Sequence, residues 1–514
     1  MRNMKMKYVV ISAVALLLLI AVALLQIFLY GNILPGPSEP ERMINKPNAV
    51  SENPMKLGSG YYDTTWPSEH ADQIRSHAVL SAGLPQDLDT SKLKLQVSST
   101  ELYMPTWGYT RGDNDIFVIG GSPQFMTTFT ESIKEGEGLS KLKLLTYTAK
   151  DMWSSDVAYV AKINTETNTK SILELDKGST VNYTGGLLMH ANGYVYAVSQ
   201  SVLYQIDPDQ MVITKSVDLP KVGNSLTNYW TTYNGLQVLD NGELVLKGFH
   251  ILNNANLDGY LLLIDPDTLQ MDIKQKARVS SARLAIKDND LYHVNAEEVL
   301  RFHITDQGFI RDDSYTATYR TQSDQSTQAS SPMLLPGIDM LVFADNTAPG
   351  ADTPMRLYTK STKDGNGKLQ SAHAFTTDKP SFNFFMVGGD TFVNNLVVYY
   401  DPLNNLVSAN KIHDDGSISL LWEREGIKAS ASPAIAVESG QVYIDDYTNG
   451  KDHFVVLDLT SGEELGRVEL PATLPTVGTI FVGENNDVFV LSSEAGQKTG
   501  YVSRITVAVE SIFP

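Results

Sequence analysis

Histidine offers this chain the widest range of chemistry, because imidazole binds metals and exchanges a proton near neutral pH. The chain has nine histidines. Four of them, His190, His293, His303 and His373, lie in the first, second, third and fourth apolar runs of the repeat described below, so their positions within the repeat differ. Ligands that converge on one ion would need equivalent positions. The sequence therefore predicts structural histidines and no metal site.

Other catalytic and ligand-binding patterns are incomplete or missing. The stretch from Asp364 to Leu369 resembles the start of a calcium-binding EF-hand loop, but Lys368 stands where an oxygen ligand is needed and Leu369 where the turn needs glycine. Neither a glycine-rich phosphate loop nor a Gly-x-Ser-x-Gly elbow occurs. The absence of cysteine excludes thiolate metal sites and a thiol nucleophile. The 59 acidic residues allow many carboxylate pairs, and the sequence alone does not select one.

The first thirty residues predict a membrane anchor. Arg2, Lys5 and Lys7 precede an apolar run over residues 8–30. At about 1.5 Å per helical residue this run spans a bilayer core, and the basic residues keep the amino terminus in the cytoplasm. A cleaved secretory signal is the alternative, but its apolar core is about 7–15 residues long and ends at a small-residue site that is missing here. We expect a single-pass anchor in the cell membrane, with the rest of the chain outside.

Residues 31–60 are rich in proline, glycine, serine and charged residues, which predicts a flexible linker. The net charge of the chain is −19, and residues 1–30 hold three basic residues and no acid, which leaves −22 on the exported part. Because nucleic acid and anionic lipid both require a positive surface, this charge argues against either as a partner of the exported part. Apart from the lipid around residues 8–30, we expect no such partner.

The elements that would position any site are short β-strands in a regular repeat. From about residue 100, pairs of apolar runs are joined by tight turns rich in glycine, asparagine and aspartate, which adopt the positive φ angles of hairpins. Successive turns are 49, 47, 48, 52, 51 and 46 residues apart, counted at Gly193, Gly242, Asn289, Gly337, Gly389, Gly440 and Asn486. A period near 50 that contains only strands indicates a β-propeller over residues 61–514.

The repeats predict an all-β propeller of eight blades, with seven as the alternative. An eighth hairpin turns at Asp113–Asp115, and the surplus before the next turn predicts an insertion in the first blade over residues 122–156. The last repeat stops after two strands. Because closing the ring removes an exposed strand edge, we expect residues 93–97 to supply its outermost strand.

Two kinds of motif carry a family resemblance. The turn at residues 460–464, after the strand that ends at Asp458, and the lead-in at residues 430–435 resemble the repeat of the PQQ-like, or quinoprotein-like, β-propellers. Residues 66–76, followed by Gly83-Leu84-Pro85, resemble the stretch that precedes the first blade in many of them. The resemblance covers most of residues 61–514.

The resemblance implies the propeller fold but not one activity, because the superfamily contains PQQ-dependent dehydrogenases as well as scaffolds without catalysis. Its dehydrogenases hold PQQ against a vicinal disulfide and carry a docking tryptophan in each blade. This chain has no cysteine and five tryptophans, and Leu465 and Met211 stand where docking tryptophans are expected. We therefore expect no bound cofactor.

In a propeller, the residues before each innermost strand gather around the mouth of the channel, where ligands commonly bind. These positions are 106–107, 183–184, 229–230, 281–283, 330–331, 382–383, 430–432 and 476–477. They hold aromatic and hydroxyl side chains and one arginine, which suit a sugar, a peptide or a polar metabolite. As ligand-binding residues we predict Trp107, Tyr183, Tyr229, Trp230, Arg283 and Asn383. Ordinary packing between blades is the alternative explanation.

Two functions follow as hypotheses. The first is a membrane-anchored binding or scaffold module for envelope proteins or glycans. The alternative is an exported enzyme of the PQQ-like class, which would be a quinone-dependent oxidoreductase, or a hydrolase or lyase that acts at the channel mouth. The missing hallmarks of a quinone site favour the first hypothesis.

Overall fold

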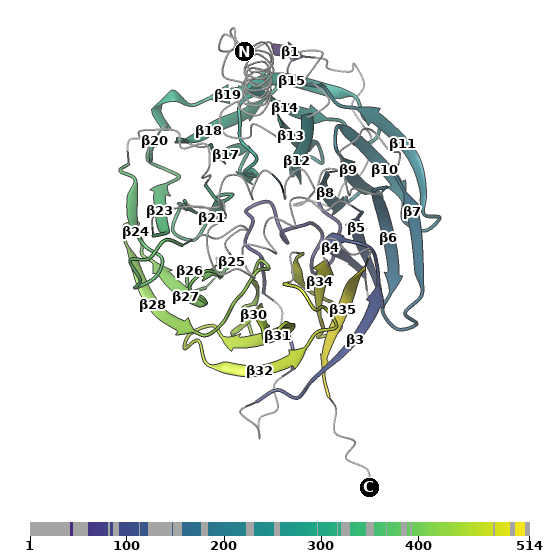
Figure 1. Ribbon diagram of the computed structural model, residues 1–514. Helices are drawn as coiled ribbons and strands as arrows, with labels where there is room; N and C mark the ends of the chain where they lie inside the picture. The colour runs from purple at the N-terminus through teal and green to yellow at the C-terminus, as the bar shows by residue number, and fades with distance from the viewer. Residues whose placement is uncertain are drawn as a thin grey trace, which may run out of the picture.

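The structure is a computed structural model. It describes residues 42–44, 60–80, 83–85, 92–112, 114–121, 146, 157–175, 183–222, 231–250, 258–295, 297–315, 317–319, 329–345, 354–365, 367–381, 388–390, 393–475, 478–493 and 499–508. These residues form eight sheets around one axis (Figure 1). The chain is an all-β eight-bladed propeller, and the prediction of eight blades is confirmed.

Each blade has four antiparallel strands, named here from the axis outward. Blade 1 contains β4 (Pro105–Gly112), β5 (Asp115–Gly120), β6 (Tyr159–Asn164) and β7 (Lys170–Glu174). Blade 2 contains β8 (Thr184–Met189), β9 (Val195–Ser199), β10 (Val202–Asp207) and β11 (Val212–Asp218). Blade 3 contains β12 (Thr231–Val238), β13 (Leu244–His250), β14 (Asp258–Ile264) and β15 (Met271–Arg278). Blade 4 contains β16 (Ala285–Lys287), β17 (Asp290–Val294), β18 (Glu298–Thr305) and β19 (Gly308–Arg311), followed by η2 (Asp313–Tyr315) and β20 (Ala317–Thr318), which pairs with β18.

The second half of the ring repeats this order. Blade 5 contains β21 (Met333–Leu335), β22 (Met340–Ala344), β23 (Arg356–Ser361) and β24 (Gln370–His373). Blade 6 contains β25 (Gly388–Asp390), β26 (Leu396–Asp401), β27 (Leu406–Ile412) and β28 (Ile418–Glu425). Blade 7 contains β29 (Ala434–Ala436), β30 (Gln441–Thr448), β31 (Lys451–Asp458) and β32 (Glu464–Glu469), and β2 (Ala78–Val79) runs parallel to β29. Blade 8 contains β33 (Ile480–Val482), β34 (Val488–Ser493), β35 (Gly500–Val507) and β3 (Leu95–Glu101).

The burial of each strand explains the sequence pattern. Strands near the axis are packed on both faces, so every residue of β9 and β13 is buried. Outer strands such as β11 contain only exposed and half-buried residues. Fully buried strands read as continuous apolar runs, whereas half-buried strands alternate. The core is therefore a set of layers between neighbouring blades.

The ring is closed by a strand from before the first blade. β3 pairs with β35 in antiparallel register, from Leu95 opposite Val507 to Glu101 opposite Tyr501. The predicted closing strand is confirmed, although it begins two residues later than expected and runs four residues further. Its pairing covers an edge of β35 that would otherwise be exposed.

A segment that precedes the first blade runs through the centre of the ring. We call residues 60–80 and 83–85 the axial segment; it is the purple trace at the centre of Figure 1. Main-chain N–H groups of six inner strands donate hydrogen bonds to its carbonyl oxygens. The pairs are Thr110 to Trp66, Met189 to Pro67, Ile286 to Gln73, Leu334 to Ile74, Gly389 to Ser76 and Ile435 to His77, at 2.9–3.1 Å. The axial segment thus ties the inner strands of blades 1, 2, 4, 5, 6 and 7 together.

Side chains extend these contacts to the two remaining blades. The Tyr61 hydroxyl donates to Gln237 Oε1 of blade 3 at 2.7 Å. The Thr65 N–H donates to Glu484 Oε1, next to the first strand of blade 8, at 3.2 Å. One segment is therefore bonded to all eight blades.

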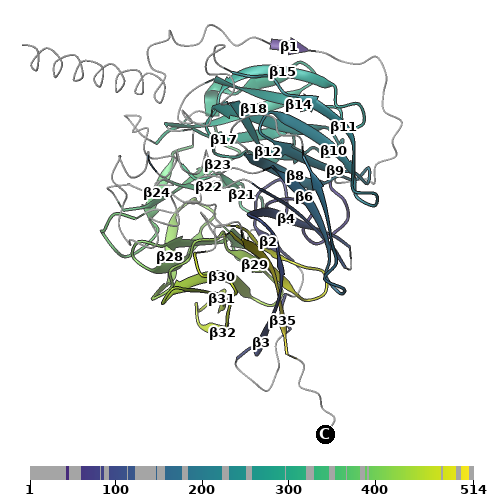
Figure 2. The ribbon, with the colours of Figure 1, turned by 45° about the vertical axis from the view of Figure 1, so that its right-hand side comes forward.

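The predicted linker contributes one described strand. β1 (Arg42–Ile44) pairs with β15 and adds a fifth strand to the outer edge of blade 3, as the view in Figure 2 shows. Apart from β1 and Gly60, residues 31–60 lie outside the described part of the chain, where the flexible linker stays a prediction. Residues 8–30 also lie outside it. No helix among the described residues is long and apolar enough to cross a membrane.

Trp422 joins blades 6 and 7. Its indole N–H donates a 2.9 Å hydrogen bond to the carbonyl of Leu459, and its ring lies against Gly462, where a Cβ would come within 2.7 Å of it. Replacing Trp422 by phenylalanine removes this buried hydrogen bond, so we expect the free energy of unfolding to fall by about 1–2 kcal/mol. Denaturant unfolding measures the change. The neighbouring Leu421→Ala is the control, because Leu421 is exposed and its loss should have little effect. An equal loss in both variants would contradict the assignment.

Candidate functional site at the propeller axis

The two faces of the propeller differ in the length of their connections. Because strands alternate in direction, the connections after the first and third strand of each blade lie on one face, which we call the turn face. These connections are short, for example residues 288–289 and 306–307 in blade 4. The opposite face, which we call the mouth face, carries the long connections, including residues 121–158, 219–230 and 374–387. Most of the predicted ligand-binding residues belong to connections on the mouth face.

The predicted insertion belongs to the mouth face. It joins β5 to β6 of blade 1, and residues 122–156 lie outside the described residues except for Thr146. The two ends of the insertion are close together, since a Cβ on Gly121 would lie 2.3 Å from the Val157 carbonyl oxygen. The insertion therefore leaves and rejoins the blade at one point.

The axial segment enters and leaves the channel at the turn face. The Gly60 carbonyl accepts from the Ala191 N–H just after β8, and the Val79 carbonyl accepts from the Val437 N–H just after β29. Between these points the segment carries Glu69, His70, Arg75 and His77 among the inner strands, where all four are buried. The axial segment therefore closes the channel at the turn face, and its polar side chains fill the interior of the channel.

Glu69 is the centre of this interior cluster. Its Oε1 is 2.7 Å from His70 Nε2 and 3.8 Å from a terminal nitrogen of Arg75, and it pairs with the Arg283 guanidinium. The Arg283 guanidinium lies 4.4 Å from the centroid of the Trp107 ring. We call Glu69, His70, Arg75, His77, Arg283 and Lys247 the axial charge cluster.

Lys247 is a third basic side chain next to the two arginines, and burial together with these arginines lowers its pKa well below the usual value. It lies on β13, and its Nζ donates to Asn234 Oδ1 at 2.6 Å and to the Ser280 carbonyl at 2.7 Å. It also lies 4.8 Å from the centroid of the Phe249 ring, which Tyr183 contacts edge-on at 5.7 Å. The cluster therefore contains three basic side chains around one carboxylate in the interior of an acidic protein.

Burial controls the ionisation of this cluster. It raises the pKa of Glu69, while the neighbouring guanidiniums of Arg283 and Arg75 oppose the rise. Burial lowers the pKa of His70 and of His77 well below the usual value, and nearby arginines add to the effect. Burial also lowers the pKa of Arg75 to about 9. Both histidines are thus neutral at neutral pH and act as hydrogen-bonding groups.

Several polar atoms of the cluster are buried and have no hydrogen-bond partner within the described part of the chain. They include Glu69 Oε2, one terminal nitrogen of Arg283, His77 Nδ1 and, next to the cluster, Trp66 Nε1. A buried polar atom without a partner costs about 1–3 kcal/mol. These atoms at the axis therefore lower the stability of the folded protein, and the packing of the surrounding blades keeps the cluster in this arrangement.

The structure brings three of the six predicted ligand-binding residues to this region. Trp107 and Arg283 contact each other, and the Tyr183 hydroxyl is 3.5 Å from Asn234 Nδ2. All three side chains are buried, and packing between blades accounts for their contacts. Their role in binding a ligand stays a prediction. The other three lie outside the described residues; they are Tyr229, Trp230 and Asn383.

Sequence reasoning does not identify Glu69, His70, Arg75 or His77 as site residues. Their polar and apolar neighbours follow no regular period and no catalytic motif, and residues 66–76 only resemble a stretch that precedes the first blade. One feature of the sequence could have indicated this cluster. Charged and imidazole side chains are closely spaced between Trp66 and Ala78, two apolar residues that are buried.

The four strand histidines lie in separate local environments. His190 Nε2 is 2.8 Å from the Gly242 carbonyl, His293 Nε2 accepts from the Ser280 N–H at 2.9 Å, and His303 Nδ1 is 2.5 Å from Asp290 Oδ1. His373 Nδ1 lies 3.9 Å from Asp378. Across the described ranges, no three histidine or acidic side chains are grouped so that they could hold a metal ion.

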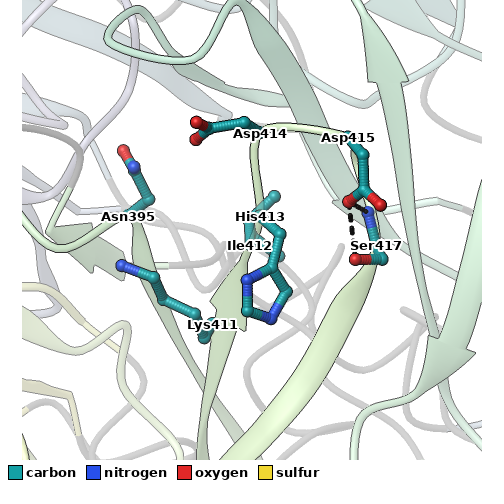
Figure 3. Close-up of a pocket in the computed structure, with 7 residues that line it drawn as sticks. All are labelled: Asn395, Lys411, Ile412, His413, Asp414, Asp415 and Ser417. Carbon is teal, nitrogen blue, oxygen red and sulfur yellow. Dashed lines mark hydrogen bonds between the residues drawn. The ribbon is translucent and has the colours of Figure 1, made fainter.

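One further indentation lies on the turn face of blade 6 (Figure 3). It is lined by Asn395 and by residues 411–415 and Ser417 of the turn between β27 and β28. The Asp415 carboxylate accepts from the Ser417 hydroxyl at 2.6 Å, and this bond holds the pKa of Asp415 below its usual value. The contacts are those of a hairpin turn, so we do not regard the indentation as a candidate site.

Comparisons with known proteins identify the fold. No protein-family model matches the chain, and no curated protein matches it. Among solved structures, the quinohemoprotein alcohol dehydrogenase of Comamonas testosteroni is similar, with a TM-score of 0.57 and 10% identity over 88% of this chain and 82% of that one. The quinohemoprotein alcohol dehydrogenase ADHIIG of Pseudomonas putida HK5 has a TM-score of 0.53 and 11% identity over 87% and 81% of the two chains. At such identity the likeness concerns the fold alone.

The residues along the axis do not fit a quinone cofactor. The Arg283 guanidinium covers one face of the Trp107 ring, and the His70 ring lies edge-on to it at 5.5 Å. The space that a planar cofactor would need beside this tryptophan is thus filled by the axial charge cluster. The chain also has no cysteine for the vicinal disulfide of the dehydrogenases.

Proposed function

The chain has the eight-bladed fold of the PQQ-like propellers, and from this premise we propose that it is a membrane-anchored binding or scaffold module. Residues 8–30 hold it in the cell membrane, with the amino terminus in the cytoplasm and the propeller outside. The partner is a protein or glycan of the cell envelope, and it binds at the mouth face. The concentration of long connections on that face carries the proposal.

Two observations support the mouth face as the binding surface. Functional residues gather on connections that a rigid scaffold positions, and the longest connections of this propeller, such as residues 121–158, leave from one face. The opposite face is built from short turns with local hydrogen bonds, such as those between Asp458 and the main chain of Thr460 and Ser461. The axial segment and the axial charge cluster join the inner strands at the turn face, and so make a rigid base for the connections on the mouth face.

Removing the insertion in blade 1 tests the proposal. Residues 122–156 would be replaced by Asn-Gly, the two-residue connection that joins β30 to β31 in blade 7 at Asn449-Gly450. Because Gly121 and Val157 are adjacent, we expect the shortened hairpin to close and the unfolding temperature to change by only a few degrees. The measurement is photo-crosslinking of the full-length protein on intact cells of its own host.

We expect crosslinked partners with the natural protein and their loss in the shortened variant. The control is Asp414→Ala with Asp415→Ala, which changes the turn face of blade 6 and should leave the crosslinks unchanged. Crosslinks that survive the shortening but disappear in the control would place the binding surface on the turn face and contradict the proposal.

A further inference from the structure

We propose that the outer edge of blade 3 faces the membrane and binds anionic lipid headgroups through Lys274, Lys276 and Arg278. The inference rests on the proposed membrane anchor and adds to it a defined orientation of the propeller on the bilayer. Three observations carry it: the docking of β1, the length of the chain before it, and the charge of β15.

The strand β1 fixes the point at which the chain reaches the propeller. Arg42, Met43 and Ile44 lie opposite Gln275, Lys274 and Ile273 of β15 in antiparallel register. Main-chain pairing of this kind adds an extended segment to an open sheet edge. The chain that comes from the membrane therefore meets the propeller at the rim of blade 3 and continues from there to the axis at Gly60.

The chain before β1 is short compared with the propeller. Residues 31–41 span at most about 40 Å, since an extended residue covers at most about 3.3–3.6 Å. A compact domain of about 450 residues has a radius of gyration of about 22 Å, which corresponds to a body about 60 Å across. This short tether keeps blade 3 within about 40 Å of the bilayer, whereas blade 7 lies on the opposite side of the ring and has no such tie.

The charge of β15 matches an anionic surface. Lys274, Lys276 and Arg278 alternate along the strand and so share one face; the two lysines are half-buried and the arginine is exposed. Within the described residues, neither Lys274 nor Arg278 forms an ion pair, and Lys274 Nζ lies 5.2 Å from the centroid of the Tyr260 ring. On blade 7 the corresponding strand β32 has two glutamates and one arginine.

The net charge of the chain conceals this local difference. A charge of −19 argued against anionic lipid as a partner of the exported part, but three basic residues are concentrated at the rim to which the membrane tether is attached. Each lysine or arginine close to an anionic bilayer strengthens the attraction about fivefold, and salt weakens the effect. The tether brings blade 3 near the lipid, and the basic strand then holds it there.

The test compares two equivalent turns on opposite sides of the ring. Thr268 in blade 3 and Ser461 in blade 7 both bond through main chain and hydroxyl to the aspartate that begins their turn. Since the natural chain has no cysteine, Thr268→Cys and Ser461→Cys each provide one labelling site. The full-length protein is placed in lipid nanodiscs with acceptor dyes on the headgroups, made from phosphatidylcholine alone or with one quarter phosphatidylglycerol.

We expect several-fold more efficient energy transfer from position 268 than from position 461 in both kinds of nanodisc. Phosphatidylglycerol should increase the transfer from position 268, and 0.5 M salt should reverse the increase. The triple variant Lys274→Gln, Lys276→Gln, Arg278→Gln should lose only the part that depends on anionic lipid, because β1 still attaches the tether to blade 3.

The outcomes separate the inference from the proposed anchor. Protein that purifies free of nanodiscs would overturn the membrane anchor and, with it, the orientation. Protein that enters the nanodiscs but transfers equally from the two positions would overturn the orientation and leave the anchor standing. A dependence on phosphatidylglycerol that persists in the triple variant would show that β15 does not bind the lipid.

Discussion

Replacing Glu69 by glutamine is expected to lower the free energy of unfolding by about 3–5 kcal/mol, because it leaves buried arginines without their carboxylate. Glu69 pairs with Arg283 and lies 3.8 Å from Arg75, and all three side chains are buried. The shape of the side chain is kept, so the loss reflects charge rather than packing. Denaturant unfolding of the two proteins measures it.

The exposed pair of Lys451 and Glu469 provides the control. These two side chains form an ion pair at the rim of blade 7, where both are about half exposed. Glu469→Gln should leave the unfolding midpoint unchanged, because exposed ion pairs contribute little. A loss below 1 kcal/mol for Glu69→Gln would mean that the guanidiniums find other partners or water, and that the axis is not the closed ionic core described above.

The free energy of unfolding should fall by about 2–3 kcal/mol between pH 7 and pH 5. Each proton that the unfolded chain binds in excess of the folded protein lowers this free energy by about 1.4 kcal/mol per pH unit of acidification. Burial lowers the pKa of His70, His77 and His293 well below the usual value. In the unfolded chain these histidines take up protons as the pH falls through about 6.5, while in the folded protein they stay neutral. Protonation therefore favours the unfolded chain.

Three buried acids act in the opposite direction. One is Glu69, whose pKa burial raises against the opposing effect of Arg283 and Arg75. Burial raises the pKa of Asp72 and of Asp445 to about 6, although hydrogen bonds from Ser76 and Ser430 oppose the rise. Between about pH 4 and pH 6 these acids hold protons in the folded protein but not in the unfolded one, which stabilises the folded state on acidification. Burial also lowers the pKa of His190. The three histidines named above and His190 together outweigh the three acids, so the net slope keeps its sign.

Unfolding free energies at pH 5, 6 and 7 check this prediction. His293→Gln keeps an acceptor for the Ser280 N–H and removes one of the three histidines, so we expect its slope to be smaller than that of the natural protein. A flat profile in both proteins would show that the axial histidines reach solvent and become protonated in the folded state.

Much of the fold could be predicted from the sequence because it depends on local patterns. Turn residues such as Gly193 and Gly242 adopt positive φ angles at a regular spacing, and the buried strands between them read as apolar runs. The truncated last repeat required a closing strand, and β3 supplies it. These signals act over a few residues or repeat along the chain, so no three-dimensional information was needed.

The interior of the ring could not be predicted in the same way. Glu69 is next to Arg283 in space but more than two hundred residues away in sequence, and no periodic pattern connects them. Trp107, Tyr183 and Arg283 were predicted from their position before an inner strand, which correctly brought them to the axis. Whether a side chain at such a position is exposed or covered depends on what fills the channel, and here the axial segment fills it.

Because the axial segment is bonded to every blade, it also constrains how this propeller can evolve. Propellers gain or lose whole blades when a repeat is duplicated or deleted, and each such event changes the circumference of the channel. The carbonyls from Trp66 to His77 are spaced to meet inner strands at the circumference of eight blades. A ring of seven or nine would leave several of them without donors. The spacing of these carbonyls is thus matched to a ring of eight blades.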